Sequence, residues 1–357
     1  MRRIRVMIVD DVAIVRRLVN DALVTDPELQ VVGTAGNGRE ALAKIPVLQP
    51  DLLILDYEMP EMNGLETLRE VRRAHPGVRV ILFSTHTRYG AKVTLEALWL
   101  GADDYATKVT ANSLSDAARC VQSDLIPKIK AICGSGVLES PAPAPAAPRP
   151  AAAAPSGPRA EILAIGASTG GPKALATILE ALPSDFPIPI VVVQHMPPLF
   201  TRSLAERITS STPHRGAEGA DGTPLTAGTV WIAPGDRHMT VARQSGEVRL
   251  RLSSDPPENS CRPSVDPLFR SVGDVYGGGA LALVLTGMGQ DGLRGARRIR
   301  DGGGRVLVQD EATSVVWGMP GAVARAGLAD LILPVTGIAG EILRLTAVAP
   351  GRRAPVA

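Results

Sequence analysis

Aromatic side chains are scarce in this 357-residue chain, and neither sign of charge is in clear excess. Aromatics make up 3% of the sequence, so the stacking platforms that hold single-stranded nucleic acids are not expected. The 38 basic side chains nearly cancel the 36 acidic ones, which leaves no positive surplus to bind a phosphate backbone. The composition therefore excludes nucleic acid as an expected partner.

Cysteines and long apolar runs are also few. The three cysteines, Cys120, Cys133 and Cys261, are widely spaced and form no CxxC pattern, which favours reduced thiols over a disulfide framework or a zinc site. The N-terminal MRRIRVMIVDD reaches acidic residues too soon to be a signal peptide, and the apolar run around 190–193 is far shorter than a membrane span. These absences predict a soluble cytoplasmic protein without direct membrane insertion.

A Pro- and Ala-rich segment divides the chain. Residues 141–158 contain 7 prolines and 8 alanines, and such a stretch has too few bulky side chains to offset the entropy of ordering it. We expect it to be an extended, semi-stiff spacer that allows two domains to dock and undock. The predicted organisation is a domain at 1–128, a Pro/Ala-rich linker at 129–159, a domain at 160–348 and a flexible tail at 349–357.

Short apolar strands alternate with amphipathic segments in both halves, which predicts α/β domains with parallel sheets. The expected strands are Arg5–Val9, Gln30–Thr34, Leu52–Leu55, Val78–Phe83 and Asp104–Thr107, then Ile162–Ile165, Ile188–Gln194, Ala280–Thr286, Arg305–Gln309 and Leu331–Leu333. Helical spacing is clear at Ile14–Leu23, Leu65–Ala74 and Lys92–Leu100. Thr229–Ile232 and Val248–Leu252 are interpreted as an antiparallel excursion.

Polar side chains follow the predicted strands of the first half. Asp10 and Asp11 follow the first strand, Asp56 the third, Ser84 the fourth and Lys108 the fifth. Because ligands bind outside the carboxyl ends of parallel strands, all five are expected at one pocket. Three carboxylates there repel one another, and an all-oxygen site of this kind suits Mg²⁺. One carboxylate oxygen could then attack a phosphoryl donor, with lysine and serine holding the new phosphate oxygens.

A simpler alternative is that Asp10 and Asp11 only cap the following helix, whose N-terminus favours acidic groups. The full set resembles response-regulator receiver domains, however. The resemblance covers about residues 4–128 and depends on VDD at 9–11, LDYEMPEMNG at 55–64, the hydroxyl at Ser84 and the lysine at 108.

This resemblance implies a flavodoxin-like (βα)5 fold and a role for each acidic residue. Asp56 would be the phospho-acceptor, Asp10 and Asp11 would bind Mg²⁺ with it, and a sensor histidine kinase would supply the phosphoryl group. One position departs from the pattern, because Val109 follows Lys108 where receivers usually have proline.

The second half contains a strand-to-helix turn that carries a serine. Gly166-Ala167-Ser168-Thr169-Gly170 matches G-x-S-x-G, in which glycines permit a sharp turn that presents a nucleophilic hydroxyl. The alternative is that Ser168 and Thr169 cap the helix, and the motif alone leaves both interpretations open.

A serine nucleophile needs a base, and a base needs an orienting acid. His195 directly follows the strand IPIVVVQ and is expected at the same sheet edge as Ser168, with His238 as the second candidate. Asp291 lies in GMGQDG, just past the carboxyl end of the strand ALALVLT. The order Ser, His, Asp along the chain argues against the common hydrolase fold, although a triad is defined by geometry and not by order.

GMGQDG also permits a different interpretation. Gly287, Gly289 and Gly292 fit the dinucleotide fingerprint after a strand, and Asp310 ends the next strand about 20 residues later. A dinucleotide-dependent oxidoreductase is thus a second hypothesis, although it leaves the serine and histidine unused. A DNA-binding response regulator is a third, disfavoured because no basic recognition helix is visible.

Six motifs together resemble the catalytic domain of chemotaxis protein-glutamate methylesterases of the CheB type. They are GASTGGP, VVQHMPP, WIAPGDRHM, RPSVDPLF, LTGMGQDG and WGMP, and they cover about residues 160–345. The resemblance implies a Rossmann-like α/β domain with a mainly parallel sheet, with Ser168 as nucleophile, His195 as base, Asp291 as its partner and the Met288 N–H as oxyanion donor. No cofactor is implied for this esterase site.

The same resemblance implies the substrate and its control. The enzyme would hydrolyse γ-glutamyl methyl esters, and deamidate certain glutamines, on the cytoplasmic regions of chemoreceptors in chemotaxis or a related sensory pathway. It also implies that the unphosphorylated receiver covers the Ser168 crevice and that phosphorylation weakens this docking.

Overall fold

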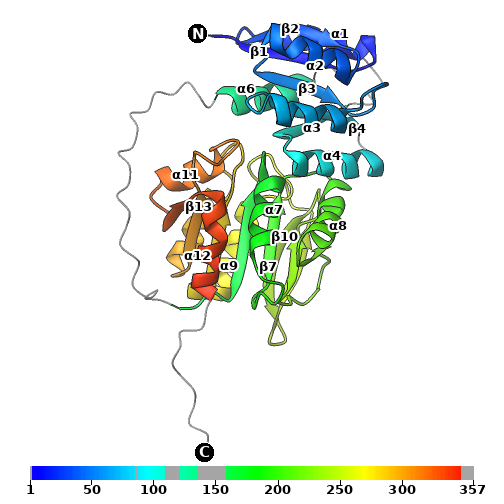
Figure 1. Cartoon of the computed structure of the whole chain (residues 1–357). Coiled ribbons are helices and arrows are strands. Elements are labelled where there is room, and N and C mark those ends of the chain that lie inside the picture. Colours follow the sequence, from blue (N-terminus) through cyan, green and yellow to red (C-terminus); the bar gives the residue numbers. More distant parts are fainter. Residues whose placement is uncertain (1, 86, 109–118, 120, 135–157, 347–357) are drawn as a thin grey trace, which may run out of the picture.

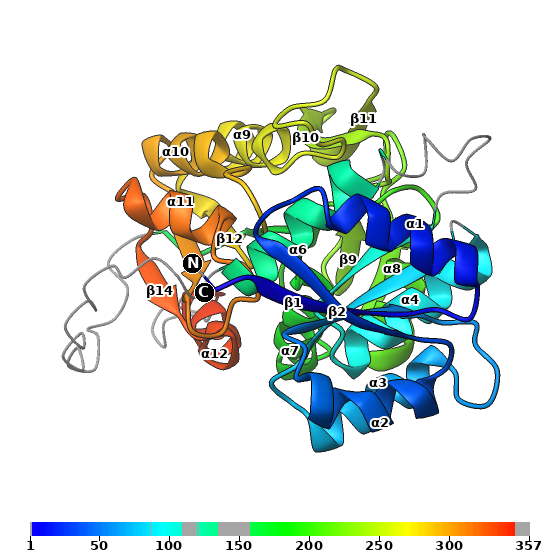
Figure 2. The ribbon, with the colours of Figure 1, turned by 90° about the horizontal axis from the view of Figure 1, so that it is seen from above.

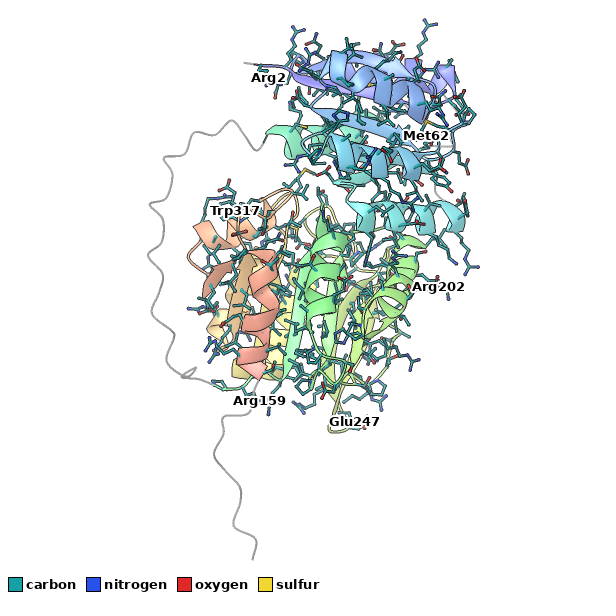
Figure 3. The ribbon with its side chains drawn as sticks, in the orientation of Figure 1. Arg2, Met62, Arg159, Arg202, Glu247 and Trp317 are labelled. Atoms are coloured by element: carbon teal, nitrogen blue, oxygen red, sulfur yellow. The ribbon has the colours of Figure 1, made fainter. Side chains whose placement is uncertain are left out.

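Two α/β domains lie one above the other in the structure, a computed structural model (Figure 1). It describes residues 2–85, 87–108, 119, 121–134 and 158–346. Most of the expected linker, the expected tail at 349–357, Cys120 and Val109 lie outside the described residues. Trp317 lies at the end of the second domain that faces the first, and Arg159 lies at the opposite end (Figure 3).

The first domain is built on a five-stranded sheet with the order β2-β1-β3-β4-β5, in which all pairings are parallel. The predicted strands and the predicted parallel sheet are confirmed. The strands are β1 (Ile4–Val9), β2 (Leu29–Ala35), β3 (Leu52–Asp56), β4 (Arg79–Thr85) and β5 (Asp104–Lys108). The helices are α1 (Ala13–Leu23), α2 (Gly38–Leu48), α3 (Gly64–Ala74), α4 (Arg88–Leu100), the π-helix η1 (Val121–Leu125) and α6 (Ile126–Gly134).

Local chemistry sets where these helices begin and end. Asn63 and Glu66 form a reciprocal capping box at the start of α3, which satisfies two otherwise free N–H groups. At the other end of the domain, α6 continues to Gly134 and buries Ile129 and Ile132 in the core. The apolar helix α6 therefore extends past residue 128 into the segment expected as linker.

The second domain has a seven-stranded sheet with the order β14-β13-β12-β6-β7-β9-β8, again parallel at every pairing. Its strands are β6 (Ile162–Ala167), β7 (Ile190–Gln194), β8 (Arg215–Glu218), β9 (Thr229–Ile232), β12 (Ala280–Val284), β13 (Arg305–Gln309) and β14 (Leu331–Leu333). Its helices are α7 (Gly171–Ala181), α8 (Phe200–Ser211), α9 (Val265–Tyr276), the 3-10 helix η2 (Gly277–Gly279), α10 (Leu293–Asp301), α11 (Met319–Arg325) and α12 (Val335–Thr346).

The antiparallel excursion is present, but of the two expected strands only Val248–Leu252 belongs to it. It consists of β10 (His238–Gln244) and β11 (Glu247–Ser253), joined by a tight turn. β9 belongs instead to the main sheet, where Val191 pairs with Trp231 in a parallel register. The sequence interpretation of Thr229–Ile232 was wrong because the apolar residues of a short strand do not show which neighbour the strand pairs with.

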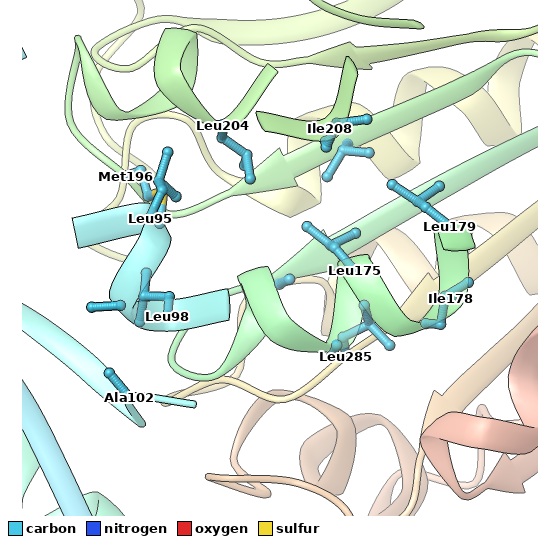
Figure 4. Close-up of a cluster of buried hydrophobic side chains, with 14 of the residues drawn as sticks. Leu95, Leu98, Ala102, Leu175, Ile178, Leu179, Met196, Leu204, Ile208 and Leu285 are labelled. Atoms are coloured by element: carbon cyan, nitrogen blue, oxygen red, sulfur yellow. The ribbon is translucent and has the colours of Figure 1, made fainter. Parts of the chain in front are cut away.

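Helix α4 packs against α7 and α8 of the second domain, and Figure 2 shows α4 beside α8 from above. Leu95 and Leu98 of α4 point toward Met196, Leu204 and Leu175 of the second domain (Figure 4). All five side chains belong to one buried cluster that spans both domains. This apolar contact removes side chains from water on both sides and thereby stabilises the docked arrangement.

In the part of the chain that the structure describes, every helix is too short or too polar to pass through a lipid bilayer.

Candidate active site and acidic pocket

The acidic pocket of the first domain forms at the carboxyl ends of β1 and β3. One carboxylate oxygen from each of Asp10, Asp11 and Asp56 lies within 4.8 Å of the others. Lys108 ends β5, and its Nζ lies 2.7 Å from Oδ2 of both Asp10 and Asp56. Three hard oxygen donors at this spacing fit a small divalent cation such as Mg²⁺.

Burial and Lys108 shift the pKa of Asp56 in opposite directions. Burial raises the pKa of Asp56 to about 6, although Lys108 lowers it. Burial lowers the pKa of Lys108, but its hydrogen bonds to Asp10 and Asp56 outweigh this and the pKa is raised. The lysine is thus a fixed positive charge beside a buried carboxylate, an arrangement suited to receiving an anionic phosphoryl group.

Ser84 connects this pocket to the domain boundary. Its Oγ donates a hydrogen bond to the carbonyl of Gly90 at 3.3 Å, and Gly90 lies in the first turn of α4. The capping alternative for the aspartates holds only in part, since Asp10 Oδ1 accepts a hydrogen bond from the Val12 N–H at 2.9 Å. Asp11 is exposed and makes no side-chain cap at the start of α1.

The turn after β6 carries Ser168. Gly170 adopts a φ of +76° and is the N-cap of α7, with no side-chain cap. Neither Ser168 nor Thr169 therefore caps the helix, so the capping alternative for this motif is wrong. A Cβ at Gly287 would lie 2.7 Å from the Ser168 Cβ, so only glycine allows the GMGQDG loop to approach this turn so closely.

His195 lies beside Ser168 because of strand register. Ala167 pairs with Gln194 in the parallel β6–β7 ladder, and Ser168 and His195 are the residues that follow this pair. The His195 N–H donates to the Ala167 carbonyl at 3.1 Å, which extends the pairing by one step. Within the described residues the Ser168 hydroxyl makes no hydrogen bond to the imidazole, so the serine is adjacent to His195 but not engaged with it.

Asp291 holds the imidazole. His195 Nε2 lies 2.8 Å from Asp291 Oδ2, and both side chains are largely buried. Burial lowers the pKa of His195, but hydrogen bonds to Asp291 and Cys261 outweigh burial and raise it to about 9. Burial raises the pKa of Asp291, yet the histidine and other donors hold it at about 2. The structure thus joins an ionised carboxylate to a strongly basic imidazole.

The segment before α9 surrounds the Asp291 carboxylate with donors. Ser264 Oγ and Asn259 Nδ2 each reach Asp291 Oδ1 at 2.8 Å, and the Val265 N–H reaches Oδ2 at 2.7 Å. Such donors fix the carboxylate in the orientation that binds Nε2, as expected for an acid that orients a base. The sequence analysis identified the motif RPSVDPLF but assigned no role to Ser264 or Asn259.

Comparison with known proteins is consistent with both halves of this description. Residues 163–342 match the CheB methylesterase family model, and residues 6–119 match the response regulator receiver domain model. A protein-glutamate methylesterase/protein-glutamine glutaminase of Trichodesmium erythraeum is 50% identical over 349 residues, covering 96% of this chain and 99% of that protein. The chain belongs to the CheB methylesterase family.

Further relatives agree with this CheB assignment. A Nocardioides protein of the same name is 49% identical over 348 residues, covering 96% of this chain and 95% of its own length. The crystal structure of the Thermotoga maritima CheB methylesterase catalytic domain superimposes with a TM-score of 0.51 at 43% identity, covering 52% of this chain and 98% of that one. The chain is therefore a CheB-type hydrolase with an N-terminal receiver domain.

The competing interpretations of the CheB domain do not fit its contacts. The Asp310 carboxylate accepts hydrogen bonds from the N–H and Oγ1 of Thr313, so it is engaged in a local turn. His238 uses both ring nitrogens structurally, accepting from the Ser264 N–H at Nδ1 and contacting the Pro256 carbonyl at Nε2. The dinucleotide hypothesis is thus wrong, and both ring nitrogens of the second candidate base are engaged by backbone groups.

The receiver contacts the turn that carries Ser168 directly. Thr169 Oγ1, next to Ser168, donates to Asp104 Oδ2 at 2.6 Å, and both residues are buried. The Tyr105 ring stacks on Phe200 with a centroid separation of 4.8 Å. The first residues of β5 therefore lie against both the Ser168 turn and the start of α8, which follows the His195 loop. No motif links Thr169 to Asp104, so the sequence analysis missed this contact.

Proposed function

We propose that this CheB-type protein is a phosphorylation-activated serine esterase. It hydrolyses γ-methyl esters of glutamate, and deamidates specific glutamines, on the cytoplasmic regions of chemoreceptors, as part of adaptation in chemotaxis or a related sensory pathway. The observation that carries the proposal is the 2.8 Å contact between His195 Nε2 and Asp291, one strand from Ser168. Methanol release from a methylated receptor fragment tests it.

The proposed reaction uses the three residues in turn. Nδ1 of neutral His195 accepts the Ser168 proton as Oγ attacks the ester carbonyl, while Asp291 holds the Nε2–H and stabilises the imidazolium that forms. The imidazolium then protonates the departing methoxy group, or the departing amine when the substrate is glutamine. Water, deprotonated by His195, hydrolyses the acyl-serine and restores the enzyme.

Backbone N–H groups are proposed to bind the tetrahedral oxyanion. Met288 follows Gly287, whose Cα lies against Ser168, and within the described residues its N–H donates no hydrogen bond to protein. The start of α7 adds the positive end of a helix dipole to the same corner. One such donor contributes about 3–4 kcal/mol of transition-state stabilisation in a comparable serine enzyme.

The receiver is proposed to accept a phosphoryl group from a sensor histidine kinase at Asp56. Asp10, Asp11 and Asp56 would hold Mg²⁺, and the ion when bound neutralises charge on the phosphate oxygens. Lys108 and Ser84 would contact the same oxygens. Turning Ser84 toward a phosphate removes its hydrogen bond to Gly90 and so alters the start of α4, the helix that packs on the catalytic domain.

The domain organisation follows from the same proposal. A receiver that ends at Gly134 is connected through the Pro/Ala-rich segment to a catalytic domain that begins near Arg159, whose Nε donates to the Thr346 carbonyl. We propose that the cytoplasm is its compartment, since both the receptors' methylated regions and the kinase would be met there.

Replacing Asp56 by asparagine is expected to abolish activation by phosphodonors and leave basal methanol release within about twofold. The amide removes the attacking carboxylate oxygen without changing side-chain size, and Asp56 belongs to β3 of the first domain, whereas Ser168 belongs to the second. The measurement is methanol release with and without acetyl phosphate and Mg²⁺. Full activation of the variant would contradict the assignment of Asp56.

Activity is expected to rise with pH up to about 9. The pKa of His195 is raised to about 9, so at lower pH most of the imidazole is protonated and cannot accept the Ser168 proton. kcat/KM should therefore increase about tenfold per unit between pH 6 and 8. Ser168→Ala measured in parallel corrects for spontaneous ester hydrolysis, and a corrected profile that is flat over this range would contradict the role of His195 as base.

A further inference from the structure

His195 has a second polar neighbour besides Asp291. Cys261 Sγ lies 3.6 Å from His195 Nδ1, within the range of a hydrogen bond to sulfur. Since Nε2 is bound to Asp291, Nδ1 is the nitrogen left for proton transfer. Cys261, His195 and Asp291 thus form a continuous thiol–imidazole–carboxylate row beside Ser168.

The thiol is held in place by a tight turn. Glu258 and Cys261 exchange backbone hydrogen bonds of 3.2 and 2.9 Å, and Asn259 within this turn is bound to Asp291 at 2.8 Å. The Glu258 carboxylate forms an ion pair with Arg270 of α9. The turn is therefore tied both to the acid of the active site and to the following helix, and Cys261 is only half-buried.

We propose that Cys261 is a covalent modification site for small soft electrophiles, hydroperoxides in particular, and that its modification inactivates the esterase. The proposal deepens the proposed function and rests on it for the inactivation only. A thiol beside a positively charged imidazolium is in general a better nucleophile near neutral pH than an isolated thiol, because the positive charge stabilises the thiolate, which is the attacking form.

The chemistry is balanced as follows. The Cys261 thiol loses its proton to water, and the thiolate, held beside the protonated imidazole of His195, attacks one oxygen of a hydroperoxide. The O–O bond breaks, and the sulfur is oxidised by two electrons to a sulfenic acid. The released hydroxide or alkoxide takes a proton from the imidazolium, which regains one from water. A thiol reductant then forms a mixed disulfide with loss of water, and a second thiol restores Cys261.

Modification blocks the esterase because the Cys261 sulfur lies beside His195 Nδ1, the nitrogen that accepts the Ser168 proton in the proposed reaction. An added oxygen or alkyl group at Sγ occupies the space between Nδ1 and an approaching hydroxyl. The other described cysteine offers a control within the same chain. Cys133 lies in α6, where burial raises the pKa of its thiol to about 12 and keeps it in the unreactive form.

The test uses full-length protein in which Cys120 and Cys133 are changed to serine, so that Cys261 is the only thiol. Iodoacetamide labelling is followed by mass spectrometry at pH 6.5, in the folded chain and in urea. A free thiol is mostly protonated at this pH, so we expect folded Cys261 to react at least about tenfold faster than the unfolded reference. A slower rate in the folded chain would overturn the proposal.

Two further variants separate the thiol from the esterase. Ser168→Ala should label at the unaltered rate, since labelling needs no ester hydrolysis, and His195→Gln should label roughly tenfold more slowly. In the protein whose only thiol is Cys261, methanol release should fall in proportion to the fraction of Cys261 that is labelled. Peroxide should also lower methanol release, and dithiothreitol should restore it. Cys261→Ser should keep its own starting activity under both reagents.

The outcomes distinguish this proposal from the proposed function. Fast labelling without any methanol release from untreated protein would leave the reactive thiol established and the esterase proposal refuted. Full methanol release from completely labelled protein would refute inactivation by modification of Cys261. An unchanged labelling rate in His195→Gln would refute the activation of Cys261 by His195. If His195→Gln does not fold, the comparison with the urea-unfolded chain still decides.

Discussion

Replacing Ser168 by alanine is expected to lower methanol release by about 1,000-fold or more, because removing the nucleophile of a serine triad leaves only binding and oxyanion stabilisation. The variant should fold normally. The Ser168 hydroxyl makes no hydrogen bond among the described residues, and the turn is fixed by Gly170 and by the backbone bond from Gly171 to the Ser168 carbonyl. The measurement is initial-rate methanol release from methylated receptor fragment.

Two controls make this result specific to Ser168. Phosphorylation of the receiver by acetyl phosphate should proceed as in the parent, since Asp56 belongs to the other domain. Ser210→Ala on the exposed end of α8 should retain full methanol release, because among the described residues its hydroxyl bonds only to the Arg207 carbonyl. Residual Ser168→Ala activity within tenfold of the parent would show that another group attacks the ester, and the adjacent Cys261 would be examined first.

Much of the candidate site could be predicted because the carboxyl ends of parallel strands lie at the same edge of the sheet. The residues at the carboxyl ends of β1, β3 and β5 form the acidic pocket, and those after β6 and β7 form the serine–histidine corner. Position along a strand is a local property, and a parallel sheet converts it into a shared edge. Ser168 and His195 therefore needed only two correctly placed strands to be brought together.

What the sequence did not reveal depends on contacts between distant segments. The donors to Asp291 from Asn259 and Ser264 come from a loop 27 to 32 residues earlier in the chain, and no periodic pattern predicts its path. The Thr169–Asp104 bond crosses 65 residues and a domain boundary. Its only signal was that both residues were expected at sheet ends, which does not specify which ends face each other.

The error in the second sheet has the same origin. β9 alternates half-buried and buried residues as an antiparallel edge strand would, yet it pairs in parallel with β7. Its outer neighbour β8 carries only small and polar residues, so it lacks the apolar pattern of a strand. A strand that short and polar is stabilised by its place in the sheet rather than by its own preference.

Removing the receiver is expected to raise basal methanol release at least about tenfold, because measured activity scales with the fraction of molecules whose site is open. In the docked structure β5 lies against Thr169, and α4 covers Met196 and Leu204. The fragment lacking residues 1–158 should fold, since the Thermotoga maritima catalytic domain was crystallised alone and superimposes on this region. Methanol release is compared per mole of active serine, titrated with a serine-directed inhibitor.

A single substitution in full-length protein should give part of the same effect. Leu95→Ala removes a buried contact between α4 and the catalytic domain, and large-to-small changes of this kind cost about 2–5 kcal/mol. Leu68→Ala is the control, because Leu68 is equally buried but lies in α3 within the receiver's own core. If it destabilises the receiver without raising methanol release, the effect of Leu95→Ala is assigned to weaker docking. Equal activation by both variants would mean that receiver unfolding, not release of a docked domain, exposes the site. Unchanged or lower methanol release from the fragment lacking residues 1–158 would refute occlusion itself. It would mean that removing Asp104 and Tyr105 from beside the Ser168 turn does not make the site more accessible.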